Sequence, residues 1–300
     1  MKHIPLHQTD AFTDTLFCGN PAGVAFDADS LSTTEMENIA REMNLSETAF
    51  VLKPTADNAD CKLRYFTSGK AEIKFCGHAT VAALYEMGRA GEYGMAEPGT
   101  YALKIETNAG VLPMSVIKKS AADITVQFSA PNVQLEEYAN DLSAFAKRLG
   151  IPPAALDQTK PVMIDRNLNY IYMAASSLKA LGDLDFSFQH IIDTFREENI
   201  VVFCLLVAET VDAANTVHMR GLAPLVGVPE DPFTGSAQAG MATYARQNAM
   251  VDQSLHTLKV EQGHFIGRPG CAAIAVPRTA NDPYLITGQA VHVFSTTITL

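Results

Sequence analysis

The 300-residue sequence lacks the features that mark membrane, secreted and nucleic-acid-binding proteins. It has no run of about 18 consecutive apolar residues, so no membrane-spanning helix is expected. The first residues, Met1 to Leu6, lack the long apolar segment of a secretory signal, and we expect a cytoplasmic protein. Only 22 residues are lysine or arginine, against 33 aspartates and glutamates. This acidic balance argues against nucleic acid and anionic membranes as partners, because phosphates need a basic face.

Cysteines, histidines and glycines also lack the spacing of the common cofactor and metal sites. The five cysteines contain no Cys-x-x-Cys pair, so neither a disulfide framework nor a zinc site is expected. The eight histidines show no ligand spacing, and we expect no metal. No Gly-x-Gly-x-x-Gly follows a predicted strand, so we expect no nicotinamide or flavin cofactor. Cys204 stands in an apolar run at 201–206 and is predicted to lie in the core.

What is present indicates a globular fold in which short strands alternate with a few helices. The chain is 47% hydrophobic, and its length indicates two domains rather than one. The first helix has a well-defined start, because Ser32 and Glu35 form a capping box. Met36 begins an apolar stripe at helical spacing, and Asn44 is the predicted stop. The apolar pattern is lost near residues 117 to 123, where we expect the boundary between domains.

Two segments, 75–83 and 230–241, resemble each other. Each places a glycine among small polar residues before a predicted helix, about Ala79 to Gly88 in one and about Ser236 to Gln247 in the other. The first turn of a helix has backbone N–H groups without intrahelical partners, and its dipole favours negative charge. Small residues let an anion approach that backbone. Two such elements facing each other could hold a carboxylate and stabilise charge on the neighbouring carbon without metal or coenzyme.

A third segment adds a carboxylate, Glu47, between the end of the first helix and an apolar strand. An exposed glutamate at the start of a strand is the common interpretation of such a residue. A carboxylate that is drawn toward an apolar wall, however, has a raised pKa and can act as a general acid or base.

Together these segments resemble the phenazine-biosynthesis PhzF-like family. The resemblance spans nearly the whole chain in the order of the family, and it rests on the motifs Asp10-Ala11-Phe12-Thr13, Gly19-Asn20-Pro21-Ala22, Ser46-Glu47-Thr48, Cys76-Gly77-His78-Ala79-Thr80, Glu230-Asp231-Pro232-Phe233-Thr234-Gly235-Ser236-Ala237 and Glu261-Gln262-Gly263-His264-Phe265-Ile266-Gly267-Arg268-Pro269.

The resemblance implies an α/β (α+β) fold of two pseudo-symmetric lobes like those of diaminopimelate epimerase, each a curved mixed sheet around a central helix. The N-terminal lobe would span 1–118 together with a returning C-terminal strand at 289–300, and the second lobe would span 119–288. The active site of the family lies between its two lobes. Members are typically homodimers, and a small carboxylic acid is the implied substrate.

The resemblance also implies the roles of particular residues. The family's best understood activity is a proton transfer, in which Glu47 would take and return the proton as general acid and base. The other implied catalytic residues are His78, Asp231 and Ser236. The implied substrate-binding residues, with the two glycines as backbone donors, are Cys76, Gly77, Thr234 and Gly235. Gln238 departs from the His or Cys that other members often carry beside the site.

Three functions stay open from the sequence. The first is an isomerase that uses Glu47. The second is an epimerase or lyase of small amino or hydroxy acids that depends on Cys76, because a thiol at a helix N-terminus can have a lowered pKa. Racemases of this fold use two opposed cysteines, and Thr234 stands where the second would be, which disfavours a two-cysteine reaction. The third is a dimeric metabolite-binding protein without catalysis.

Overall fold

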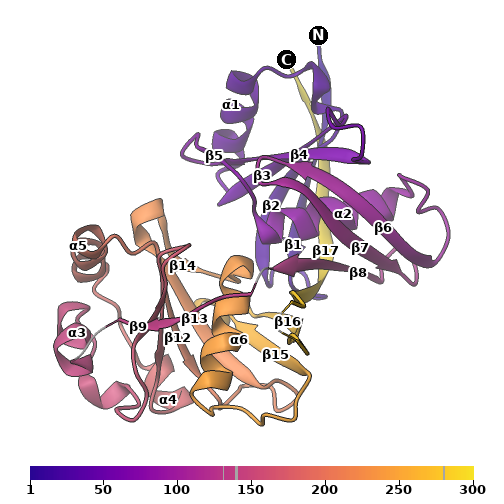
Figure 1. The fold of residues 1–300 in the computed structure, drawn as a ribbon. Coiled ribbons are helices and arrows are strands. Elements are labelled where there is room, and N and C mark those ends of the chain that lie inside the picture. The colour runs from indigo at the N-terminus through magenta and orange to yellow at the C-terminus, as the bar shows by residue number, and fades with distance from the viewer. Residues whose placement is uncertain (131, 139–140, 280) are drawn as a thin grey trace. The chain divides into compact units, whose positions relative to one another are not determined.

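The computed structural model describes residues 1–130, 132–138, 141–279 and 281–300 (Figure 1). The chain divides into two compact units, unit 1 at Met1–Ser129 with Leu285–Leu300, and unit 2 at Ala130–Tyr284. The sequence boundary near 117 to 123 falls inside unit 1, because the strands on either side of it pair with each other. Within the described ranges, no helix combines the length and apolar character that a bilayer crossing requires.

Unit 1 holds the first half of the strands and the last one. In chain order its elements are β1 (His3–Ala11), β2 (Asn20–Ala25), α1 (Thr33–Met43), β3 (Glu47–Leu52), β4 (Cys61–Thr67), β5 (Glu72–Ile73), α2 (Gly77–Ala90), β6 (Gly99–Thr107), β7 (Gly110–Lys118), β8 (Ile124–Ala130) and, apart from its first residue, β17 (Tyr284–Thr299).

The strands of unit 1 close into a ring around α2 (Figure 1). The ring runs β1, β2, β3, β4, β6, β7, β8, β17 and back to β1, with parallel pairs at β2–β3 and β4–β6. Every residue of α2 from Gly77 to Gly88 is buried. A helix with small and apolar residues on all faces belongs in a core, and this composition explains its central place. The helix begins two residues earlier than its apolar pattern predicts.

Helix α1 confirms the capping box. The Glu35 backbone N–H donates to Ser32 Oγ at 3.3 Å, and the Ser32 backbone N–H donates to Glu35 Oε2 at 2.7 Å. Asn44 ends the helix in the left-handed conformation, with φ of 52°. The predicted stripe, with Met36 fully buried, faces a core that includes Phe50.

Unit 2 begins at Ala130, the last residue of β8. In chain order its elements are β9 (Glu136–Glu137), α3 (Leu142–Arg148), β10 (Met163–Asp165), β11 (Tyr170–Ala174), α4 (Leu178–Gly182), α5 (Phe188–Glu198), β12 (Val202–Val207), β13 (Val217–Ala223), β14 (Val228–Asp231), α6 (Gln238–Gln247), β15 (Thr257–Gln262) and β16 (Gly270–Ala275).

The strand pairing of unit 2 repeats that of unit 1. The series β10, β11, β12, β13, β15, β16 alternates antiparallel and parallel pairs, as β1, β2, β3, β4, β6, β7 does. In each unit a short strand and then a central helix separate the fourth and fifth members of the series, β5 and α2 in one and β14 and α6 in the other. The mixed fold of two pseudo-symmetric halves is therefore confirmed, and 76–78 and 234–236 occupy equivalent positions.

Two sequence expectations for unit 2 have different outcomes. Cys204 lies on β12 with no exposed surface, so its assignment to the core is confirmed. The helix expected from Ser236 instead opens with a 3-10 turn at Gly235–Ala237, and α6 starts at Gln238. The tighter turn arises because the Ala237 backbone N–H donates to Thr234 O, three residues back.

Candidate active site

The sequence motifs of unit 1 converge on the start of α2. Cys76 is the N-cap residue of this helix, and its side chain makes no capping hydrogen bond. Gly77 and His78 form the first turn. Glu47 is the first residue of β3, where the pairing with β2 and β4 fixes its direction. Glu47 Oε2 lies 3.2 Å from His78 Nε2, so the carboxylate and the imidazole form one group.

Both ring nitrogens of His78 lie against polar atoms. Nε2 also lies 3.3 Å from Ser46 Oγ, while Nδ1 lies 3.3 Å from Asn20 Nδ2 and 3.4 Å from Cys76 Sγ. The His78 side chain is 8% exposed. These contacts orient the ring, and they leave it touching both candidate acid/base groups, Glu47 and Cys76.

The turn that presents Asn20 depends on Gly19. Gly19 has φ of +60°, and a Cβ there would lie 2.2 Å from the carbonyl oxygen of Ala11. Only glycine tolerates this combination of backbone conformation and space. The Gly-Asn-Pro motif therefore has a structural reason, which is to bring the Asn20 amide to His78.

Burial raises the pKa of Glu47 above its ordinary value of 4.5, and hydrogen bonds from Ser46 and Cys76 offset part of that rise. The Glu47 side chain is 16% exposed. A carboxyl group with a raised pKa keeps its proton closer to neutral pH, which suits a residue that must both accept and return a proton. Electrostatics therefore favours the role that the resemblance implies for Glu47.

This pKa shift has a consequence for stability. The folded state binds the Glu47 proton more tightly than the unfolded state, so the stabilisation is present below pH 4.5 and is lost as the pH rises from there through the raised pKa. We expect Glu47→Gln to lack this loss. Thermal unfolding of both proteins from about pH 4 to about pH 8 measures the difference. Parallel profiles for the two proteins would contradict the raised pKa.

Unit 2 gathers a second set of polar side chains at the equivalent position. Asp231 is the last residue of β14, and Thr234 precedes the 3-10 turn. Thr234 Oγ1 donates a hydrogen bond to Asp231 Oδ2 at 2.8 Å. Ser236 is exposed, and its Oγ lies 3.0 Å from the Tyr170 hydroxyl. Gly235, which stands between Thr234 and Ser236 in the chain, is buried. The hydroxyl of Thr234 is thus committed to Asp231, while that of Ser236 reaches the surface.

Gln262 organises this second set, although the sequence pattern indicated no role for it. It is fully buried, and its Nε2 donates to Asp231 O at 2.7 Å and to Thr234 Oγ1 at 3.0 Å. Its Oε1 accepts from the Thr234 backbone N–H at 3.1 Å. Gly263 follows with φ of +84°, where a Cβ would lie 2.6 Å from Pro232 O. The only sequence signal for Gln262 was its place in the Glu-Gln-Gly motif.

The predicted site residues therefore fall into two groups, each within one unit. Glu47, Cys76 and His78 form one, and their ligand atoms lie within 4.8 Å of one another, a spacing that could also hold a metal ion. Asp231 and Thr234 form the other, beside Ser236 and its partner Tyr170.

Gln238 donates from Nε2 to Thr234 O at 3.0 Å, and its buried Oε1 has no hydrogen-bond partner among the described residues. Sequence reasoning gave no site role to four residues that contact these groups, namely Asn20, Ser46, Tyr170 and Gln262.

Residues 9–296 match the family of phenazine biosynthesis-like proteins. The chain is 31% identical to an uncharacterized isomerase of Clostridium acetobutylicum, covering 98% of each chain. It is also 31% identical to trans-2,3-dihydro-3-hydroxyanthranilate isomerase of Pseudomonas chlororaphis, covering 87% of this chain and 86% of the other. A crystal structure of a phenazine biosynthesis protein of the PhzF family from Bacillus anthracis matches over 100% of both chains, with 29% identity and a TM-score of 0.86. A probable proline racemase from Agrobacterium radiobacter shares the fold, at 11% identity and a TM-score of 0.65, over 99% of this chain and 93% of the other.

Proposed function

The chain belongs to the phenazine biosynthesis-like protein family and is an isomerase, and from this premise we propose that it moves a proton within a small carboxylic acid. Glu47 is the general acid and base in this proposal. It takes a proton from one carbon of the substrate and returns it to another. The substrate keeps its composition and its oxidation state, so the reaction needs no redox cofactor.

The observation that carries the proposal is the environment of Glu47. Its side chain is only 16% exposed, and its carboxyl group has a raised pKa and lies 3.2 Å from His78 Nε2. A base of ordinary pKa would be largely ionised at neutral pH and a weak proton donor for the second half of the reaction. His78 would hold the carboxyl group in position and adjust its hydrogen bonding as the proton comes and goes.

The remaining residues would bind the substrate and stabilise the charge that develops on it. The N-terminus of α2 at Gly77 offers a positive helix dipole, and no side-chain capping hydrogen bond is made by Cys76 at its N-cap. The equivalent set in unit 2 adds the exposed hydroxyl of Ser236 and the carboxylate of Asp231. In our proposal the substrate carboxylate lies at a helix N-terminus.

The second candidate is a reaction in which Cys76 is the base. The contact of Cys76 Sγ with His78 Nδ1, at 3.4 Å, favours it, because an imidazole can accept the thiol proton. The equivalent residue of unit 2 is Thr234, whose hydroxyl donates to Asp231. A threonine hydroxyl is too weak an acid to act as a second thiol, so this candidate would have to work with one base.

Deuterium exchange tests the two candidates. We expect the wild-type chain to catalyse uptake of solvent deuterium by its substrate in D2O. The first substrate to try is trans-2,3-dihydro-3-hydroxyanthranilate, the compound that the name of the Pseudomonas relative gives as its substrate. Other small carboxylic acids follow. Cys76→Ser should keep turnover within about 10-fold of wild type, because the thiol only contacts the acid/base pair. Loss of exchange in Cys76→Ser, with folding intact, would instead support the thiol-dependent reaction.

A further inference from the structure

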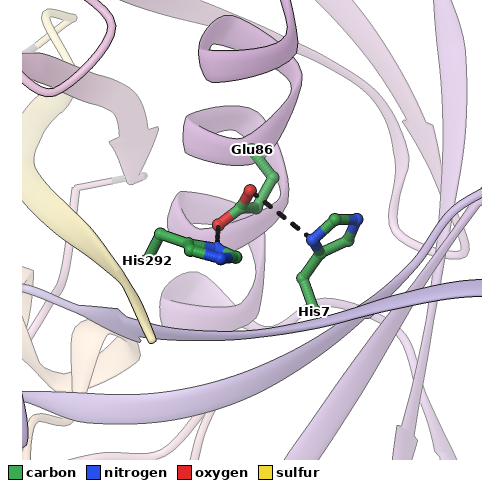
Figure 2. Close-up of side chains that lie close together, drawn as sticks. All are labelled: His7, Glu86 and His292. Atoms are coloured by element: carbon green, nitrogen blue, oxygen red, sulfur yellow. Dashed lines mark hydrogen bonds and ion pairs between the residues drawn. The ribbon is translucent and has the colours of Figure 1, made fainter. Parts of the chain in front are cut away.

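A second cluster of histidine and carboxylate side chains lies in unit 1, away from the residues discussed above. His7 comes from β1, Glu86 from the central helix α2 and His292 from β17. Figure 2 shows the three side chains pointing toward one another. Their ligand atoms, one from each residue, all lie within 4.8 Å of one another. Neither the motifs nor the proposed proton transfer uses any of them.

A β-bulge brings the two histidines to the same face of the sheet. His7 pairs with Ser295 and Gln8 with Phe294, but Thr9 pairs with His292, so β17 holds one extra residue, Val293. In a regular ladder Val293 would pair with Thr9, and the alternation of side chains would turn His292 to the other face. The bulge therefore places His292 beside His7 and over α2, where Glu86 meets both.

Glu86 is held firmly at the centre of the cluster. Its side chain is 1% exposed, and its Oε1 lies 2.8 Å from His292 Nδ1, while Oε2 lies 3.9 Å from His7 Nδ1. Thr9 Oγ1 donates to Oε1 at 2.5 Å, and Arg89 Nε donates to Oε2 at 2.8 Å. These donors fix the carboxylate in the orientation that faces the two rings.

Ser295 contacts both imidazoles, at the His292 nitrogen that does not contact Glu86 and at the same His7 nitrogen that faces Glu86. Its Oγ lies 2.9 Å from His7 Nδ1 and 3.1 Å from His292 Nε2. The side chains of His7 and His292 are 16% and 24% exposed, so solvent and solutes can reach them. Two oriented imidazoles and a buried carboxylate thus meet at an accessible edge of unit 1.

We propose that His7, Glu86 and His292 bind a zinc ion, which ties β17 to β1 and to α2. Imidazole nitrogen and carboxylate oxygen are the donors that zinc accepts, with bonds of about 2.0–2.2 Å. Tetrahedral geometry at that length separates ligand atoms by about 3.3 Å. His292 Nδ1 lies 2.8 Å from one oxygen of Glu86 and His7 Nδ1 lies 3.9 Å from the other, one below and one above that value, so side-chain rotations would bring the donors to it. Further hydrogen bonds to the carboxylate, such as those from Thr9 and Arg89, are typical of metal sites.

Zinc titration of the full-length chain tests the site. We expect one Zn2+ per chain by calorimetry and a rise in the thermal unfolding midpoint with zinc, because a ligand that binds only the folded state stabilises it. His7→Asn and His292→Asn should each weaken binding by at least about 10-fold, the lower end of the effect of losing even a supporting residue. Both histidines are partly exposed, so each variant should fold, and thermal unfolding without zinc checks this.

Two controls separate this site from others. His3 is an exposed histidine on β1, the strand that carries His7, and its Nδ1 contacts Thr299 Oγ1 at 3.1 Å. His3→Asn should leave zinc affinity unchanged. Cys76→Ser should also leave it unchanged, and bound Co2+ should show no sulfur-to-cobalt charge-transfer band. Absence of zinc binding by the wild-type chain, or affinity that survives both His7→Asn and His292→Asn, would overturn the proposal. Because neither readout involves turnover, the result is independent of the proposed isomerisation.

Discussion

Glu47→Gln is expected to lower the rate of proton transfer by about 100- to 10,000-fold, the range that a positioned general acid or base contributes. Glutamine keeps the shape of the side chain and can still contact His78, but it cannot accept and return a proton. The loss should appear in kcat rather than in substrate affinity, because the amide still fills the same space. Deuterium exchange and turnover of the substrate identified in D2O measure it.

A matched control keeps this result specific. Glu72 is another carboxylate of unit 1, on β5, and it pairs with Arg64 at 2.7 Å instead of with a site residue. Glu72→Gln should leave the exchange rate within about 10-fold of wild type, because it touches no reacting group. An unchanged rate in Glu47→Gln, with the substrate still turned over, would rule out Glu47 as the base.

Arg220→Met is expected to lower the free energy of unfolding by about 3–5 kcal/mol, the usual cost of leaving a buried charge without its partner. Arg220 and Glu230 are each 7% exposed and form a two-pronged ion pair, with contacts of 2.9 and 2.6 Å. The guanidinium also donates to Leu181 O and Leu184 O. Methionine keeps an unbranched stem of similar length, so the loss reports the charge more than the packing. Urea unfolding at neutral pH measures it.

The comparison for this variant is Arg148→Met. Arg148 is 41% exposed and pairs with Glu197 and Glu198 at the surface. Exposed pairs contribute about 1 kcal/mol or less, so this variant should unfold close to wild type. Adding Glu230→Gln to Arg220→Met should recover part of the loss, because it removes the unpaired carboxylate. Equal losses from Arg220→Met and Arg148→Met would show that burial of the pair does not matter.

The Arg220 pair also bears on the proposed site. Glu230 immediately precedes Asp231 on β14, and Asp231 accepts from Thr234. Loss of the guanidinium would free the end of β14 that carries this carboxylate. Substrate affinity in Arg220→Met would therefore fall along with stability, if the unit 2 residues bind substrate as we propose.

Local sequence signals predicted local structure well. Ser32 and Glu35 predicted the start of α1, and Asn44 predicted its end, because a capping box and a left-handed stop depend only on residues within a few positions. The start of α6 was less predictable. Gly235 to Ala237 form a 3-10 turn that the Ala237 N–H closes on Thr234 O, and Thr234 itself is held by Gln262, which is distant in sequence.

The sequence by itself determined the family, the mixed fold and the two equivalent glycine-containing helix starts, because these lie in contiguous motifs. It also singled out Glu47 and offered a raised pKa as one of two interpretations, but only burial at the start of β3, between β2 and β4, decides the direction of the shift. Only the tertiary structure brought His292 to Glu86, across 206 residues, and Gln262 to Thr234. Such contacts depend on strand register, on one bulged residue and on closure of a ring of strands. No local sequence pattern predicts the register, the bulge or the closure of the ring, and a register shift of one residue turns every side chain of a strand to the other face.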